Sequence, residues 1–134
     1  MDEKLLKLLG ISHVLGGLLL SCLLFIEPIH PLVLQLIYGT SAVPNQPQIF
    51  FWLSILGPSI ASWGVLFCLA VRQYFAHPSG DTLRMMVASI LVWAPLDSAL
   101  CLYNGIVIGA IGNALVVLVF LVLFYRVRGL AGQA

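Results

Sequence analysis

Two polar side chains, Asp97 and Asn113, stand inside long apolar stretches of the sequence. An acid is costly in hydrocarbon, so one in such a stretch normally faces the interior of a helix bundle and is a default functional candidate. Counting about 1.5 Å per residue from Arg84 and Arg126 puts both side chains at the same depth, about 20 Å from these basic residues. We expect the two to meet, as contacts for a ligand, as groups that handle a proton, or as a hydrogen-bonded pair that only fastens two helices together.

The spacing around these residues indicates which helix faces pack together. Two sets repeat every four residues, Trp93, Asp97 and Cys101 on one stretch and Gly105, Gly109 and Asn113 on the next. Small residues allow two helix backbones to approach closely. Pro95 can free a backbone carbonyl and bend the first stretch, so we expect the face of Asp97 to form one wall of a pocket.

His13 lies in the first apolar stretch, at nearly the same expected depth as Trp63 and Trp93. These three side chains could line one cavity. The more ordinary role of a single histidine in an apolar helix is a hydrogen bond to a neighbouring Ser or a backbone carbonyl. A single axial haem ligand stays open as an alternative, whereas His30 and His77 differ from His13 in depth and disfavour a bis-histidine site.

Glu27 and His30 lie three residues apart, where the first apolar stretch ends. A carboxylate and an imidazole at this spacing are close enough to couple, and the pair could gate an entrance or respond to pH. The plainer alternative is a carboxylate at a helix end that is simply solvated.

Composition predicts the elements that position these residues. Of 134 residues, 61% are hydrophobic and 8% are charged, against about a quarter charged in ordinary soluble domains. So few charged residues cannot cover a soluble fold, which nearly excludes that class. At about 20 apolar residues per crossing, the sequence predicts an all-α integral membrane protein, a single domain over residues 1–134. The expected spans, at about 5–26, 49–71, 83–103 and 106–125, would form a four-helix antiparallel bundle.

The basic residues predict the orientation of these spans. They flank only one set of span ends, at Lys4, Lys7, Arg72, Arg84, Arg126 and Arg128. By the positive-inside rule, both termini and the 73–82 loop are cytoplasmic, while residues 27–48 and the turn at Asn104 and Gly105 face outward. We therefore expect a multi-pass protein of a bacterial inner membrane. The formal charge of +1, without a basic stripe, excludes nucleic-acid binding.

The outer connection, residues 27–48, has structural signals of its own. Pro31 can open a short helix that runs to Tyr38 and stops at Gly39, as an interfacial helix or as a lid over the bundle. Two further prolines favour an extended return over residues 43–48.

Local features refine the spans and argue against one kind of site. Ser79 or Asp81 is expected to cap the third span, and Pro58 to kink the second span near mid-membrane. The cysteines lie far apart without a C-x-x-C motif or a nearby His, so no metal site is expected.

No motif identifies a reaction, so catalytic residues and cofactors stay unassigned. The leading hypothesis is a protein that binds a lipophilic small molecule or a lipid in a cavity within the membrane, with Asp97 and Asn113 as polar contacts. The full set of expected ligand-binding residues is Asp97, Asn113, Trp93, His13, Trp63, Glu27 and His30.

Three alternatives stay open. A structural or accessory subunit of a larger membrane complex, or a homo-oligomer, would use Gly10, Gly16 and Gly17 for helix contacts. A lipid-modifying enzyme would use Asp97 or His13 as acid or base. A small proton-coupled transporter would use the single intramembrane acid, Asp97.

Overall fold

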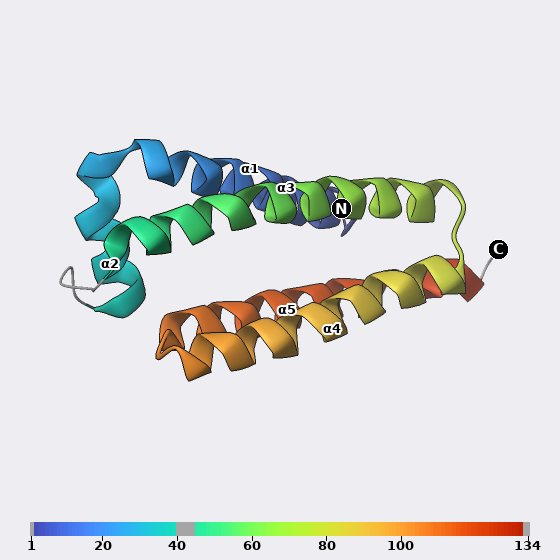
Figure 1. Ribbon diagram of the computed structural model, residues 1–134. Coiled ribbons are helices and arrows are strands. Elements are labelled where there is room, and N and C mark those ends of the chain that lie inside the picture. The colour runs from blue at the N-terminus through green and yellow to red at the C-terminus, as the bar shows by residue number, and fades with distance from the viewer. Residues whose placement is uncertain (1, 40–44, 133–134) are drawn as a thin grey trace. The chain divides into compact units, whose positions relative to one another are not determined.

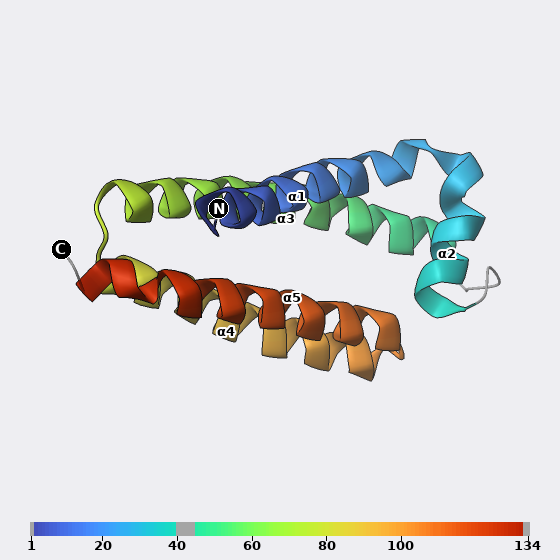
Figure 2. The ribbon, with the colours of Figure 1, turned by 180° about the vertical axis from the view of Figure 1, so that it is seen from behind.

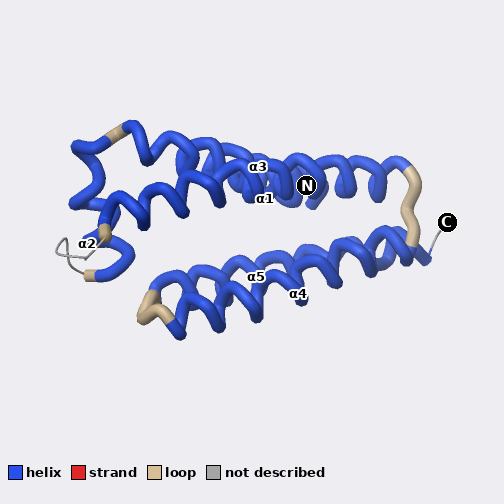
Figure 3. The backbone as a smooth tube through the Cα atoms, viewed as in Figure 1, coloured by secondary structure: helices blue, strands red, loops and turns tan. Residues whose placement is uncertain are grey.

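The structure, a computed structural model, describes residues 2–39 and 45–132. Helices and short turns make up this described part, without a strand (Figure 1, Figure 3). The α-helices are α1 (Asp2–Cys22), α2 (His30–Tyr38), α3 (Gln46–Ala76), α4 (Gly80–Tyr103) and α5 (Val107–Val127). Short 3₁₀ turns, η1 (Leu23–Phe25) and η2 (Glu27–Ile29), join α1 to α2, and η3 (Arg128–Gly132) follows α5. The prediction of an all-α chain is confirmed.

Four of the helices, α1, α3, α4 and α5, are long and apolar enough to cross a membrane. They match the four predicted spans, although α3, with 31 residues, extends beyond both ends of the predicted 49–71. Large apolar side chains cover their outer faces: Leu15, Leu66 and Leu118 are 62%, 63% and 59% exposed. Contact of such a surface with hydrocarbon costs little free energy, whereas its contact with water is unfavourable.

The chain divides into two compact units. The α1–α3 unit is Leu9–Leu66, which contains most of α1, all of α2 and the larger part of α3. The α4–α5 unit is Met1–Leu8 together with Phe67–Ala134, which contains the start of α1, the end of α3, and all of α4 and α5.

In the α1–α3 unit, α1 and α3 run antiparallel and touch through small residues. A Cβ added at Gly17 would lie within 3.0 Å of backbone atoms of Gly57 and Ala61, and one at Gly64 would lie equally close to the backbone of Gly10. Backbones this close leave no room for a side chain between them, which is how small residues promote helix packing in membranes.

This packing corrects the expectation that three glycines of the first span contact a partner. Gly10 and Gly17 contact α3 of the same chain. An added Cβ at Gly16 would have nothing within 4 Å, so only this glycine faces open space.

The short helix predicted in the outer connection is present as α2. It has Pro31 in its first turn and ends at Gly39, whose φ of 72° is left-handed and whose amide donates a hydrogen bond of 2.9 Å to the last turn. Leu34 of α2 is fully buried and packs with Leu23 and Phe50. This small core fastens α2 to the adjoining parts of its unit.

The extended return predicted over residues 43–48 is wrong in its second half. Residues 43 and 44 lie outside the described residues, but residues 46–48 already form the first turn of α3. Pro47 fits there because the first turn of a helix needs no backbone N–H from it. The amides of Gln48 and Ile49 donate to the Asn45 carbonyl at 3.0 and 3.2 Å, which starts the helix.

In the α4–α5 unit, α4 and α5 form an antiparallel hairpin and lie side by side from both directions of view (Figure 1, Figure 2). Ser79 caps α4, as predicted for this residue or Asp81, because its hydroxyl accepts hydrogen bonds of 3.2 and 3.4 Å from two amides of the first turn. At the other end of α4, Gly105 has a φ of 73° and makes the tight turn into α5. Gly105 therefore serves the turn, and it is not part of the packing stripe expected with Gly109.

Aromatic side chains join the end of α3 to α5. The ring centroids of Phe67 and Phe120 lie 5.0 Å apart, and those of Phe120 and Phe124 lie 5.8 Å apart. The buried hydroxyl of Tyr74 donates to the carbonyl of Val127 at 2.7 Å. A polar group buried in this way is stable only because it is hydrogen-bonded.

Candidate functional site: the α4–α5 hairpin

Asp97 and Asn113 meet in the α4–α5 hairpin. The Asn113 Nδ2 atom donates to Asp97 Oδ2 at 2.6 Å and to the Ser98 hydroxyl at 3.4 Å. The tight turn at Gly105 fixes the register of the two helices, which brings residues at equal distance from the turn to the same level. The predicted contact is confirmed, and Ser98 is a third polar group that the sequence reasoning missed.

Close packing next to this contact comes from Gly109 and Cys101. A Cβ added at Gly109 would lie 2.7 Å from Cys101 Sγ, so only glycine fits at this position without a shift of the thiol. Cys101 Sγ in turn lies 3.9 Å from Asp97 Oδ2. The expected approach of the helices at Gly109 is confirmed, and it places the cysteine against the acid.

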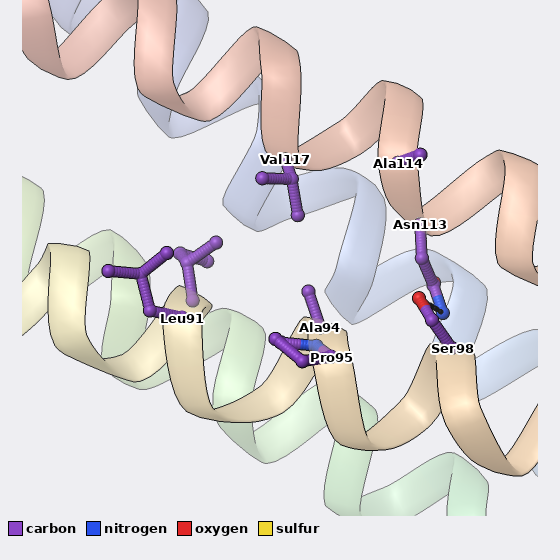
Figure 4. A pocket seen from close by; sticks show the side chains of 8 residues that line it. Leu91, Ala94, Pro95, Ser98, Asn113, Ala114 and Val117 are labelled. Atoms are coloured by element: carbon purple, nitrogen blue, oxygen red, sulfur yellow. Dashed lines mark hydrogen bonds between the residues drawn. The ribbon is translucent and has the colours of Figure 1, made fainter.

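A pocket with a volume of about 190 Å³ opens between α4 and α5 on the side of Asn113. Its lining residues are Ile90, Leu91, Ala94, Pro95, Ser98, Asn113, Ala114 and Val117. In Figure 4 the side chains of Ser98 and Asn113 point toward one another at one end of the pocket, while Leu91 and Val117 lie toward the other. The pocket therefore has an apolar body and one polar end.

The wall of this pocket differs from the one expected on α4. Trp93 and Asp97 are not among its lining residues, which instead include Leu91, Pro95 and Ser98. Residues that follow one another in a helix point about 100° apart, so the pocket lies on the face next to that of Asp97. Asp97 is linked to the pocket by the hydrogen bond that it accepts from Asn113.

Pro95 contributes more to the pocket than its ring. Because proline has no backbone N–H, it cannot donate to the Leu91 carbonyl, four residues earlier in α4. Both residues line the pocket. A residue of the wall, Leu91, thus has a backbone carbonyl that lacks its usual helical donor.

His13 and Trp63 lie together in the α1–α3 unit. Their ring centroids are 4.8 Å apart, and His13 Nδ1 hydrogen-bonds to the Leu9 carbonyl at 2.7 Å. A carbonyl oxygen only accepts, so Nδ1 carries the proton and is engaged. The backbone hydrogen bond is the ordinary role expected for this histidine. Trp93, the third side chain of the expected cavity, belongs to the α4–α5 unit.

Glu27 and His30 line a second pocket, which lies in the α1–α3 unit. His30 Nε2 donates to the Leu23 carbonyl at 2.7 Å, and its ring stacks on Phe50 with centroids 3.6 Å apart. The imidazole is thus held by Leu23 and Phe50. Glu27 and His30 share this pocket, while their coupling stays a prediction.

Neither the composition of these sites nor known proteins identify a cofactor. Within residues 2–39 and 45–132, no three His, Cys, Asp or Glu side chains are grouped so that they could hold a metal ion. No protein-family model matches the chain, and no curated protein or solved structure matches it either. Any inference about function therefore rests on the geometry and chemistry of these sites.

Proposed function

We propose that the chain is a multi-pass membrane protein whose termini and α3–α4 loop are cytoplasmic. All six Lys and Arg residues belong to the α4–α5 unit. There, an ion pair of 3.0 Å between Asp2 and Arg126 brings the start of α1 to the end of α5, and Tyr74 joins the end of α3 to the same place. A basic end of this kind supports the cytoplasmic assignment by the positive-inside rule.

Within the membrane, the proposed function is to bind a lipophilic ligand, a small molecule or part of a lipid, in the pocket beside Asn113. The observation that carries this proposal is an apolar pocket of about 190 Å³ that is lined at one end by Asn113, whose amide Asp97 holds. An apolar cavity of about 150 Å³ accommodates benzene. The pocket therefore fits a group the size of one ring or a short stretch of alkyl chain.

The polar end of the pocket favours a ligand with a hydrogen-bond donor. Both hydrogens of Asn113 Nδ2 are directed to acceptors, Asp97 Oδ2 and the Ser98 hydroxyl. The amide oxygen of Asn113 is left as an acceptor. Pro95 also leaves the Leu91 carbonyl without its usual helical donor. A lipophilic alcohol, phenol or amide N–H would satisfy the amide oxygen of Asn113.

The test is native mass spectrometry of the full chain released from mild detergent, with retained small molecules recorded. Ala114→Phe fills the pocket from α5 while both Asp97 and Asn113 stay in the chain, and should reduce retained ligand at least fivefold. Leu115→Phe is the matched control, because Leu115 is 60% exposed and does not line the pocket. Equal ligand retention by both variants, or no retained ligand in the wild-type chain supplied with a lipid extract, would contradict the proposal.

An accessory subunit of a larger membrane complex is the second candidate function. Gly16 of α1 and Gly112 of α5 have nothing within 4 Å of an added Cβ, so each offers a place where another helix backbone could approach. Under this function, Gly16→Leu and Gly112→Leu would abolish co-purification with a stoichiometric partner or a second copy of the chain. Their thermal stability would be the same or slightly higher, because an added Cβ at either glycine meets no other atom of the described residues.

A further inference from the structure

The second pocket, in the α1–α3 unit, has a chemistry unlike that of the pocket beside Asn113. It has a volume of about 380 Å³ and lies between the start of α2 and the start of α3. Its lining residues are Glu27, His30, Pro31, Gln46, Pro47 and Phe50. Prolines have a fixed φ, so the two proline walls are already rigid before a ligand binds, which favours affinity.

Glu27 gives this pocket a negative charge that its unit does not balance. It is the only Asp, Glu, Lys or Arg between Leu9 and Leu66. In the part of the chain that the structure describes, its carboxylate has neither a hydrogen-bond donor nor an ion-pair partner. A charge of this sign attracts a cation and repels an anion.

His30 adds a hydrogen-bond acceptor to the same pocket. Its Nε2 atom donates to the Leu23 carbonyl, so the neutral ring has Nδ1 as an acceptor. Stacking on Phe50, with an interplanar angle of 14°, fixes the plane of the ring. A ligand that matches a carboxylate and an imidazole acceptor is positively charged and carries N–H donors.

We propose that the Glu27 pocket binds a primary ammonium group. Such a group carries three N–H donors, whereas a quaternary ammonium group carries none. The ammonium belongs to the headgroup of phosphatidylethanolamine in the bilayer or to a free amphiphilic amine. The inference rests on the proposed membrane location and does not depend on a ligand beside Asn113.

The first experiment compares two zwitterionic lipids that differ in N–H donors. The full chain is placed in nanodiscs of equal phosphatidylethanolamine and phosphatidylcholine, released, and weighed by native mass spectrometry with its bound lipids. The wild-type chain should retain about two- to fivefold more phosphatidylethanolamine, the range that an exposed ion pair provides. Glu27→Gln should retain the two lipids equally, and Glu27→Asp should keep the preference.

Two control variants separate this site from charge effects elsewhere and from the pocket in the hairpin. Asp81→Asn removes an exposed carboxylate of the α4–α5 unit, which pairs with Arg84 at 3.3 Å, and should keep the preference. Asn113→Leu should also keep it, even if this variant loses a ligand of the hairpin. A preference that survives in a folded Glu27→Gln chain, or that Asp81→Asn removes equally, would overturn the proposal.

A second arm distinguishes the two sources of the ammonium group. In nanodiscs of phosphatidylcholine alone, decylamine and decyltrimethylammonium are added at equal concentration, and the retained amphiphile is weighed. Preferential retention of decylamine that requires Glu27, without a preference between the lipids, identifies a free amine as the ligand. If neither phosphatidylethanolamine nor decylamine is retained in a manner that depends on Glu27, the pocket does not recognise an ammonium group.

Discussion

The α1–α3 crossing and the α4–α5 hairpin hold two antiparallel helices together by different means. In the first, the backbone at Gly17 lies directly against the backbone of Gly57. In the second, the Asn113 amide reaches Asp97 at 2.6 Å beside a pocket. Backbone contact at Gly17 leaves no room for a side chain between α1 and α3, whereas a pocket lies beside the hydrogen bond of Asn113. The hairpin therefore has an open pocket, and the proposed ligand would occupy it, whereas the glycine crossing has no comparable space.

The largest effect should come from a side chain placed in the glycine crossing. Gly17→Leu forces α1 and α3 apart, because even a Cβ there would lie within 3.0 Å of backbone atoms of α3. We expect a loss of about 3 kcal/mol in the free energy of unfolding, or a chain that does not fold. Reversible unfolding in mixed micelles with increasing dodecyl sulfate, followed by circular dichroism, measures this change.

Gly16→Leu is the matched control for this prediction. The residue is next to Gly17 in α1 but faces open space. Leucine is also the better helix former by up to about 1 kcal/mol, so this variant should unfold at the same or a higher denaturant fraction. If the two variants lost stability equally, the contact between backbones would not be what holds α1 to α3.

The hydrogen bond of the hairpin should show a smaller effect and a clear energetic coupling. Asn113→Leu leaves the Asp97 carboxyl without its 2.6 Å donor, which should cost about 1–3 kcal/mol of unfolding free energy. Asp97→Leu leaves the Asn113 amide without its closer acceptor and should cost a similar amount. The double variant should lose about 1 kcal/mol less than the sum, within the range found for hydrogen bonds in membrane helices. If the losses were strictly additive in the same unfolding assay, the hydrogen bond between Asp97 and Asn113 would not contribute to holding α4 against α5.

The level of a residue along its helix was readable from the sequence, and this level accounts for the contacts that were predicted. Asp97 and Asn113 lie at the same distance from basic residues on helices joined by a tight turn, so their level follows from counting. His13 and Trp63 were likewise expected at nearly the same level, and their rings lie close together. Local signals were equally readable at Gly39, where a glycine after an apolar run ends α2 with a left-handed φ.

The direction in which a residue points around its helix axis could not be read from the sequence. This direction accounts for the pocket residues that the sequence did not predict. Counting residues gives the height of Ser98 but does not show that its face, and not the face of Trp93, forms the pocket wall. The face depends on which neighbour packs against α4, and apolar side chains surround the whole helix. The same limit applies to Gly16 and Gly17, since a small residue suits a helix of the same chain or of a partner equally well.

The smallest predicted effect distinguishes a glycine that meets a side chain from one that meets a backbone. At Gly109 an added Cβ would lie 2.7 Å from Cys101 Sγ, an atom that can move by rotation about one bond. Gly109→Ala should therefore cost only about 1 kcal/mol of unfolding free energy, the strain being partly offset by the helix preference of alanine. Removing the sulfur by Cys101→Ala in the Gly109→Ala background should restore stability, measured by the same dodecyl sulfate titration. Gly112→Ala, with open space around it, should be neutral or slightly stabilising. If Cys101→Ala failed to restore the Gly109→Ala chain, the two helices would be held as tightly at Gly109 as at Gly17, and the hairpin would lack the freedom to admit a ligand.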